Sequence, residues 1–179
     1  TGVESVRAVA QNLPALNSNI GEEQDYAFAH GLYKDGLFQI ATEQFDKFIK
    51  KYPQSVRIQD AQFLRADCLF LQEQYPAAAR EFSVFVGQYP TSILSDNARF
   101  RLGETFSKLK RNRDAIESYK SILDQPKNPS VAGEAAYWIG EIYLKEGDLT
   151  NALKYYALSY EGYAGNKLQE YAAYSAAWA

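Results

Sequence analysis

The side chains that most often perform catalysis are scarce in this sequence. His30 is the single histidine and Cys68 the single cysteine, so neither a two-histidine metal site nor a HExxH motif can form. A glycine-rich phosphate loop and a Gly-x-Ser-x-Gly motif are also absent. Glu104 and Glu141 lie 37 residues apart, where we expect solvated carboxylates rather than a general acid and base. The sequence therefore predicts no catalytic residue, no metal site and no cofactor.

Aromatic and charged side chains recur at a spacing that suits binding to another protein. One aromatic series has a 37-residue spacing: Tyr26, Phe63, Phe100, Tyr137 and Tyr174. Four residues further on, the residue type changes from one cycle to the next: His30, Asp67, Glu104 and Glu141. Further positions expected on the same helix face are Tyr33, Phe70 and Lys145. Rigid rings are good anchors for a partner protein.

Two interpretations of these series stay open. The repeated rings either grip a partner or pack against the neighbouring repeat, and strict repetition is what packing demands. The changing positions form either a groove of acidic and aromatic character edged by lysines, or an ordinary solvated helix face. Because recognition needs variation between repeats, we expect specificity at the changing positions.

The same 37-residue period governs the apolar residues that must position these side chains. An alanine series sets it: Ala41, Ala78, Ala115 and Ala152. Small residues lie twelve positions earlier: Ala29, Ala66, Gly103 and Gly140. Rings lie four positions later: Phe45, Phe82, Tyr119 and Tyr156. We expect two antiparallel helices per cycle, which approach each other closely at the small residues. The ring is expected to fill the space between its own helix pair and the next.

Turn and stop signals fall at matching places in each cycle. Gly36 and Gly147 suit the left-handed conformation that ends a first helix, whereas Glu73 and Lys110 occupy the equivalent places without glycine's freedom. The second helix is expected to end at Tyr-Pro, at residues 52–53 and 89–90, and at Gln125-Pro126 in the third cycle.

The period divides the chain into predicted segments. Residues 1–21 are expected to form an N-terminal cap or a degenerate repeat, and residues 168–179 the first helix of a fifth repeat or a capping helix. Four repeats are expected between them: 22–58, 59–95, 96–132 and 133–167. Since the terminal helix would leave an apolar face uncovered, we expect the natural chain to continue.

Composition narrows the class of partner. The chain has 19 basic and 22 acidic side chains and a net charge of −3, which does not favour a nucleic-acid binder. No apolar run approaches the roughly 18–20 residues needed to cross a bilayer. Cys68 is interpreted as a small buried side chain. Because Thr1 opens the sequence and no leader follows, we expect a mature or excised fragment whose targeting signal has been removed.

A helix pair with this rhythm of small residue, alanine and ring, a glycine turn and a proline stop resembles the tetratricopeptide repeat. The resemblance covers roughly residues 22–179 and implies an all-α, right-handed superhelical solenoid of antiparallel helix pairs. The first helices would line a concave groove that binds a protein or peptide. Tyr26 and His30 stand where carboxylate-clamp relatives use basic and amide residues, so no such clamp is expected.

The 37-residue form, with Tyr-Pro-x-Ser at residues 52–55 and 89–92, is similar to bacterial cell-envelope members of this family. Two such groups are the periplasmic partner of the Tol–Pal system and the lipoprotein of the β-barrel assembly machinery. This similarity implies a periplasmic or outer-membrane-associated location. It favours a non-enzymatic adaptor for protein–protein contacts. Alternatives are a docking arm of a larger enzyme or transport component, and arrays that associate end to end through residues 168–179.

Overall fold

The computed structural model describes residues 20–163 and 165–178, and within these ranges every regular element is a helix. The first helical stretch covers residues 20–34. It is followed by α2 (Phe38–Lys51), α3 (Ile58–Leu71), α4 (Tyr75–Gln88), α5 (Ser95–Lys108), α6 (Asn112–Leu123), α7 (Pro129–Lys145), α8 (Leu149–Ala157), the π-helical turn η1 (Leu158–Gly162) and α9 (Gln169–Trp178). The predicted all-α fold class is confirmed. The segment predicted to be a cap, residues 1–21, lies outside the described residues except for its last two positions.

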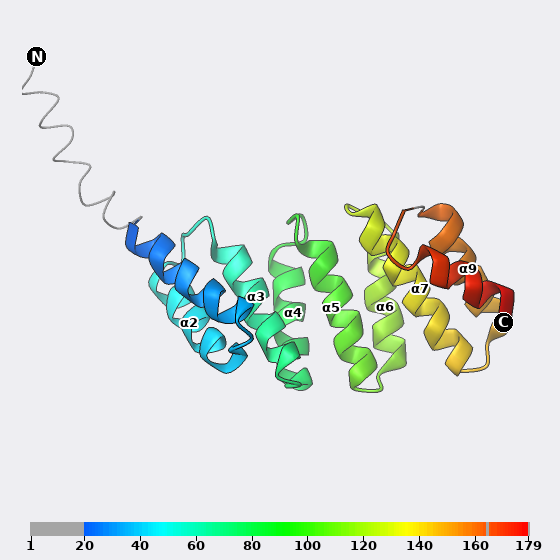
Figure 1. The fold of residues 1–179 in the computed structure, drawn as a ribbon, viewed down its shortest axis with the longest axis horizontal. Helices are drawn as coiled ribbons and strands as arrows, with labels where there is room; N and C mark the ends of the chain where they lie inside the picture. Colours follow the sequence, from blue (N-terminus) through cyan, green and yellow to red (C-terminus); the bar gives the residue numbers. More distant parts are fainter. Residues whose placement is uncertain (1–19, 164, 179) are drawn as a thin grey trace, which may run out of the picture. The chain divides into compact units, whose positions relative to one another are not determined.

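The helices belong to two compact units that divide between Gln72 and Glu73. The first unit contains residues 20–34, α2 and α3, with α2 packed on α3. The second unit contains α4 to α9, and in it each helix from α4 to α8 packs against the next in chain order. Figure 1 shows this succession for α5, α6 and α7, and α9 packs on α8 and η1.

The turn inside each helix pair has one recurring backbone geometry. After residues 20–34, the Leu37 N–H donates to the Leu32 carbonyl at 2.9 Å, and after α5 the Arg111 N–H donates to the Phe106 carbonyl at 2.9 Å. This bond belongs to the Schellman motif, which needs a left-handed residue just past the helix. Gly36 has a φ of 76°, and Lys110 adopts the same conformation with a φ of 61°. The turn is therefore closed identically with and without glycine.

Small residues at the helix crossings make room for the rings, as the period predicts. Ala29, Ala41 and Ala115 are fully buried. A Cβ on Gly103 would lie 2.5 Å from Cε1 of Tyr119, far inside van der Waals contact. The same relationship holds at Gly140, and it makes this position depend on glycine. The small series and the ring series thus form one packing unit across each pair.

The chain leaves α2 and α4 where the sequence predicts, and α6 ends at Leu123, two residues before Gln125. α2 and α4 end directly before Tyr52 and Tyr89, whose N–H groups each donate to a carbonyl four residues earlier at 2.8 Å. One side chain then organises the next bend. The oxygens of Ser55, Ser92 and Asn166, spaced by multiples of 37, each accept from the N–H two residues on. Such side-chain turns direct the chain into the following first helix.

Candidate functional site

Three of the predicted binding residues form a stacked column on residues 20–34. The rings of Tyr26 and His30 lie nearly parallel with centroids 5.9 Å apart, and those of His30 and Tyr33 likewise at 6.4 Å. All three are partly exposed. Their spacing of four and three residues places them on one helix face, as the sequence predicts. We call Tyr26, His30 and Tyr33 the aromatic column.

The aromatic column is held from below and at both ends. Tyr26 packs edge-on against Phe45 and Phe48 of α2, with centroids 6.3 and 5.6 Å apart. The Arg57 guanidinium lies 5.2 Å from the centre of the Tyr26 ring, which is a cation–π distance. At the other end, the Tyr33 hydroxyl donates to Oδ2 of Asp67 at 2.6 Å. The column therefore presents its rings in a fixed arrangement.

The structure places the remaining first-unit candidates on α3. Phe63 and Phe70 are partly exposed, whereas Asp67 between them is only 1% exposed. Asp67 therefore supports the face from beneath through its bond with Tyr33. Two positions that the sequence assigns to one binding face are thus directly bonded to each other.

In the second unit, the repeated rings pack inside their own helix pairs. Phe100 of α5 packs on Tyr119 of α6 at a centroid distance of 5.5 Å. Tyr137 of α7 packs on Tyr156 of α8 at 5.8 Å. Tyr26 has the same relationship with Phe45 in the first unit. Packing on a ring of the second helix of the same pair is therefore one role of these three rings.

The predicted acidic positions of the second unit are partly exposed and each has a partner. Glu104 accepts from Arg101 at 2.8 Å. Glu141 accepts from the Tyr156 hydroxyl at 2.7 Å, and burial together with this bond raises the pKa of Tyr156. Lys145 is exposed at the end of α7. These contacts fix the two carboxylates beside the rings of their own pairs.

The surroundings of Cys68 do not activate its thiol. Cys68 is fully buried, and burial raises the pKa of its thiol to about 12, so it stays protonated at neutral pH. Within residues 20–163 and 165–178, no group of three or more His, Cys, Asp or Glu side chains is arranged to hold a metal ion. Among the helices that the structure describes, none is long and apolar enough to span a bilayer.

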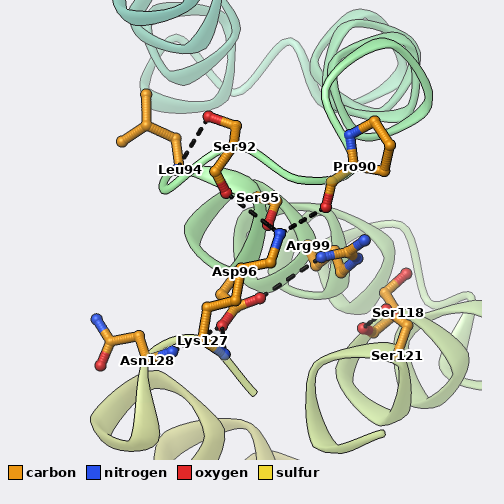
Figure 2. Close-up of polar contacts among 10 residues, drawn as sticks. All are labelled: Pro90, Ser92, Leu94, Ser95, Asp96, Arg99, Ser118, Ser121, Lys127 and Asn128. Atoms are coloured by element: carbon orange, nitrogen blue, oxygen red, sulfur yellow. Dashed lines mark hydrogen bonds and ion pairs between the residues drawn. The ribbon is translucent and has the colours of Figure 1, made fainter. Parts of the chain in front are cut away.

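The sequence does not predict a polar cluster in the second unit that forms around the buried carboxylate of Asp96. Asp96, only 1% exposed in the first turn of α5, accepts at Oδ2 from the backbone N–H groups of Lys127 and Asn128 at 2.7 and 2.9 Å. Lys127 Nζ donates back to the Pro90 carbonyl at 2.6 Å and to Ser95 Oγ at 2.9 Å. Figure 2 shows these bonds converging between two linkers.

The cluster, which we call the linker clasp, ties the loop before α5 to the loop before α7. Its one visible signal is that Lys127 replaces the proline found 37 and 74 residues earlier, at Pro90 and Pro53. Arg99 Nη1 lies 3.5 Å from the other carboxylate oxygen of Asp96. A buried carboxylate with several donors is well compensated, so the clasp is structural.

These features define a repeat protein of antiparallel helix pairs that carries aromatic and charged side chains on its first helices. A tetratricopeptide repeat family model matches residues 26–93 and again residues 100–167. The chain belongs to the tetratricopeptide repeat family. Its members are generally non-enzymatic scaffolds for contacts between proteins.

Solved structures agree with this fold. A MamA crystal structure matches at 22% identity with a TM-score of 0.62, covering 84% of this chain and 81% of that one. The tetratricopeptide-like repeats of a Podospora anserina putative kinesin light chain match at 12% identity and a TM-score of 0.67, covering 87% and 83%. BtubC from P. vanneervenii matches at 15% identity and 0.70, covering 97% and 77%. Curated protein sequences give no match.

Proposed function

We propose that this chain is a non-enzymatic scaffold whose first-helix faces bind a partner protein or peptide. The observation that carries the proposal is the aromatic column, whose three stacked rings remain partly exposed although their other sides are packed. Exposed rings in a fixed arrangement are typical anchors of protein interfaces.

The proposed mechanism is preorganisation. Tyr26 is fixed by Phe45, Phe48 and Arg57, and Tyr33 by its bond to Asp67. Each rotamer-rich side chain that must be ordered costs roughly 0.5–1.5 kcal/mol on binding. Rings that are already ordered avoid much of that cost, so a modest contact area can still give useful affinity.

Specificity is proposed to come from the positions that change between repeats. His30, Asp67, Glu104 and Glu141 follow one another at 37-residue steps, and Lys145 lies four residues beyond Glu141. Phe63, Phe70, Phe100 and Tyr137 would add apolar contacts beside them. A partner would meet different chemistry at each step of the array.

We further propose an envelope location, periplasmic or at the outer membrane, and a relationship with the Tol–Pal and β-barrel assembly groups. The support is the 37-residue period with its repeated Tyr-Pro-x-Ser linker. Fractionation of cells that produce the full-length protein tests this. Recovery with the periplasm or outer membrane supports the location, and recovery in the cytosol contradicts it.

Self-association is a second candidate, favoured by α9. Tyr174 and Trp178 contact each other at 5.9 Å yet are 65% and 77% exposed, and Tyr171 beside them is also exposed. Exposed apolar side chains that cluster are typical of interaction surfaces. Sedimentation analysis over a wide concentration range tests this candidate: reversible assembly that is lost in a Trp178→Ser variant supports it, and a monomer throughout contradicts it.

Affinity capture tests the scaffold function. The immobilised chain is compared with a His30→Ala, Phe70→Ala variant, which removes two partly exposed rings without removing the Tyr33–Asp67 bond. Phe28→Ala is the matched control, because Phe28 is an exposed ring on the same helix outside the aromatic column. Partners retained by wild type and control but lost by the double variant support the proposal. Identical capture by all three contradicts it.

A further inference from the structure

A cleft of about 770 Å³ lies in the second unit, away from the first-helix faces of the proposed scaffold. Its walls come from α4, from the end of α5 and from the turn that begins α6. Apolar side chains form most of its surface: Pro76, Ala79, Val84, Phe106 and Leu109. Val84 is 53% exposed, which is high for an aliphatic side chain on a helix that packs against α5.

The charged residues of this cleft all have one sign. Arg80 and Arg111 line it, with Ser83 as the remaining polar side chain, and no acidic residue belongs to the lining. Arg111 is held in place, because its guanidinium lies 4.6 Å from the centre of the Phe106 ring and its Nε lies 2.6 Å from Asp114 Oδ2. Arg80 is exposed and makes no ion pair with another described residue.

A neighbouring cleft in the same unit has a different charge pattern. That cleft, of about 720 Å³ between α6 and the end of α7, is lined by both Arg113 and Lys120 and by three carboxylates: Glu117, Asp124 and Glu146. Mixed charges do not favour a ligand of either sign. An apolar floor with two guanidinium groups at its rim favours a ligand that combines an apolar group with carboxylates.

We propose that the cleft between α4 and the α5–α6 turn docks an acidic segment of a partner protein. One or two aliphatic side chains of that segment enter the cleft against Val84 and Phe106, and its carboxylates meet Arg80 and Arg111. A nucleic acid is not the occupant, because two cations beside an apolar floor cannot follow a run of phosphates. The site goes beyond the proposed scaffold face, since its lining on α4, the end of α5 and the start of α6 includes none of the residues proposed for that face, and it can hold a partner independently.

Peptide titration followed by amide NMR tests this proposal on the whole chain. The probe is the capped hexapeptide Asp-Glu-Leu-Leu-Asp-Glu. Two matched peptides replace its acids by lysine or its leucines by serine. Because the chain carries a net charge of −3, general electrostatic attraction does not draw the acidic probe to it. We expect saturable binding with a Kd below about 1 mM, with shifts confined to residues 76–84 and 106–111, and neither matched peptide binding comparably.

Charge reversal of Arg80 completes the test. Arg80→Glu should raise the Kd of the probe at least about tenfold, whereas Arg113→Glu in the neighbouring cleft should change this Kd less than about twofold. Far-UV circular dichroism checks that both variants stay folded, and Val84→Asp provides a second variant with the same expected loss. The proposal is overturned if binding of the probe is undetectable, if the lysine peptide binds equally well, or if Arg80→Glu leaves the Kd unchanged. Chemical-shift changes on the first-helix faces would also overturn it, because they would assign the probe to the scaffold face.

Discussion

Tyr156 packs so closely on Gly140 that a Cβ at position 140 would lie 2.7 Å from Cδ1 of its ring. The hydroxyl of the same ring donates to Glu141 at 2.7 Å. One tyrosine therefore both fills the crossing of α7 and α8 and orients a carboxylate on the first-helix face. At the equivalent positions of the first unit, alanine and phenylalanine stand in place of glycine and tyrosine: Ala29 and Phe45.

Gly140→Ala should destabilise the protein by about 1–3 kcal/mol, because the new methyl group must displace the Tyr156 ring. Urea denaturation measures this. Adding Tyr156→Phe removes the hydrogen bond that holds the ring to Glu141 and gives the alanine–phenylalanine pair found in the first unit. The double variant should therefore lose less free energy of unfolding than the two single variants lose together. Strict additivity would contradict this coupling. Gly87→Ala, where a Cβ meets no atom within 4 Å, should not destabilise the protein.

Lys110→Gly should stabilise the second unit by about 0.5–1 kcal/mol. Lys110 holds a φ of 61°, which is costly for a residue with a Cβ and free for glycine. Gly147, at the equivalent turn, has a φ of 80°, so Gly147→Ala should destabilise by about 1 kcal/mol. Thermal unfolding gives both values. A lower melting temperature for Lys110→Gly would show that the lysine side chain stabilises the turn in another way.

Loss of the Asp96 carboxylate should open the linker clasp. Asp96→Ala leaves two backbone N–H groups, those of Lys127 and Asn128, without their buried acceptor, at an expected cost of about 2–4 kcal/mol. The hydrogen-exchange rates of these two amides should increase together with the loss of stability. Asp96→Asn retains one carbonyl oxygen as an acceptor and should cost less. Equal stability of Asp96→Ala and wild type would contradict the role assigned to the clasp.

Asp25 should make the first unit sensitive to acid. Hydrogen bonds from Lys51, at 2.8 Å, and from Tyr52, at 2.9 Å, lower the pKa of Asp25 below its ordinary value of 3.8. A folded pKa below the unfolded one means that the contribution is complete above about pH 4 and is lost as the pH falls through the folded pKa.

Asp25→Asn should therefore lower the melting temperature at pH 7, and the difference from wild type should be smaller near pH 2. The control is Asp35→Asn, since Asp35 is exposed and makes no ion pair with the rest of the described chain. A difference between Asp25→Asn and wild type that is the same at both pH values would contradict the titration of Asp25.

The helix pairs and their packing could be predicted because one period governs several residue types together. The repeated positions of alanine, such as Ala41 and Ala115, of glycine, such as Gly103, and of a ring, such as Tyr119, are explained together by one arrangement. In it, two helices cross at their small residues. The chain exits could be predicted because Pro53 and Pro90 cannot continue a helix. These sequence signals are local, and their repetition in each 37-residue cycle strengthens the prediction for the other cycles.

The sequence does not predict which side chains of the binding faces meet each other. Asp67 lies on the predicted face but is buried under Tyr33, and that bond depends on how far a tyrosine reaches between neighbouring helices. The clasp joins Asp96 to Lys127, 31 residues further along the chain, so it depends on the paths of the loops before α5 and α7. Lys110 takes a glycine-like conformation because the Schellman bonds around it outweigh its own preference.

The most direct test of the scaffold is the affinity of a captured partner, measured by isothermal titration calorimetry against three forms of the chain. We predict that His30→Ala, Phe70→Ala raises the Kd at least about tenfold relative to wild type, because two partly exposed rings of the first unit are lost. Phe28→Ala should leave the Kd within about twofold. Equal Kd values for wild type and the double variant would contradict binding at the aromatic column.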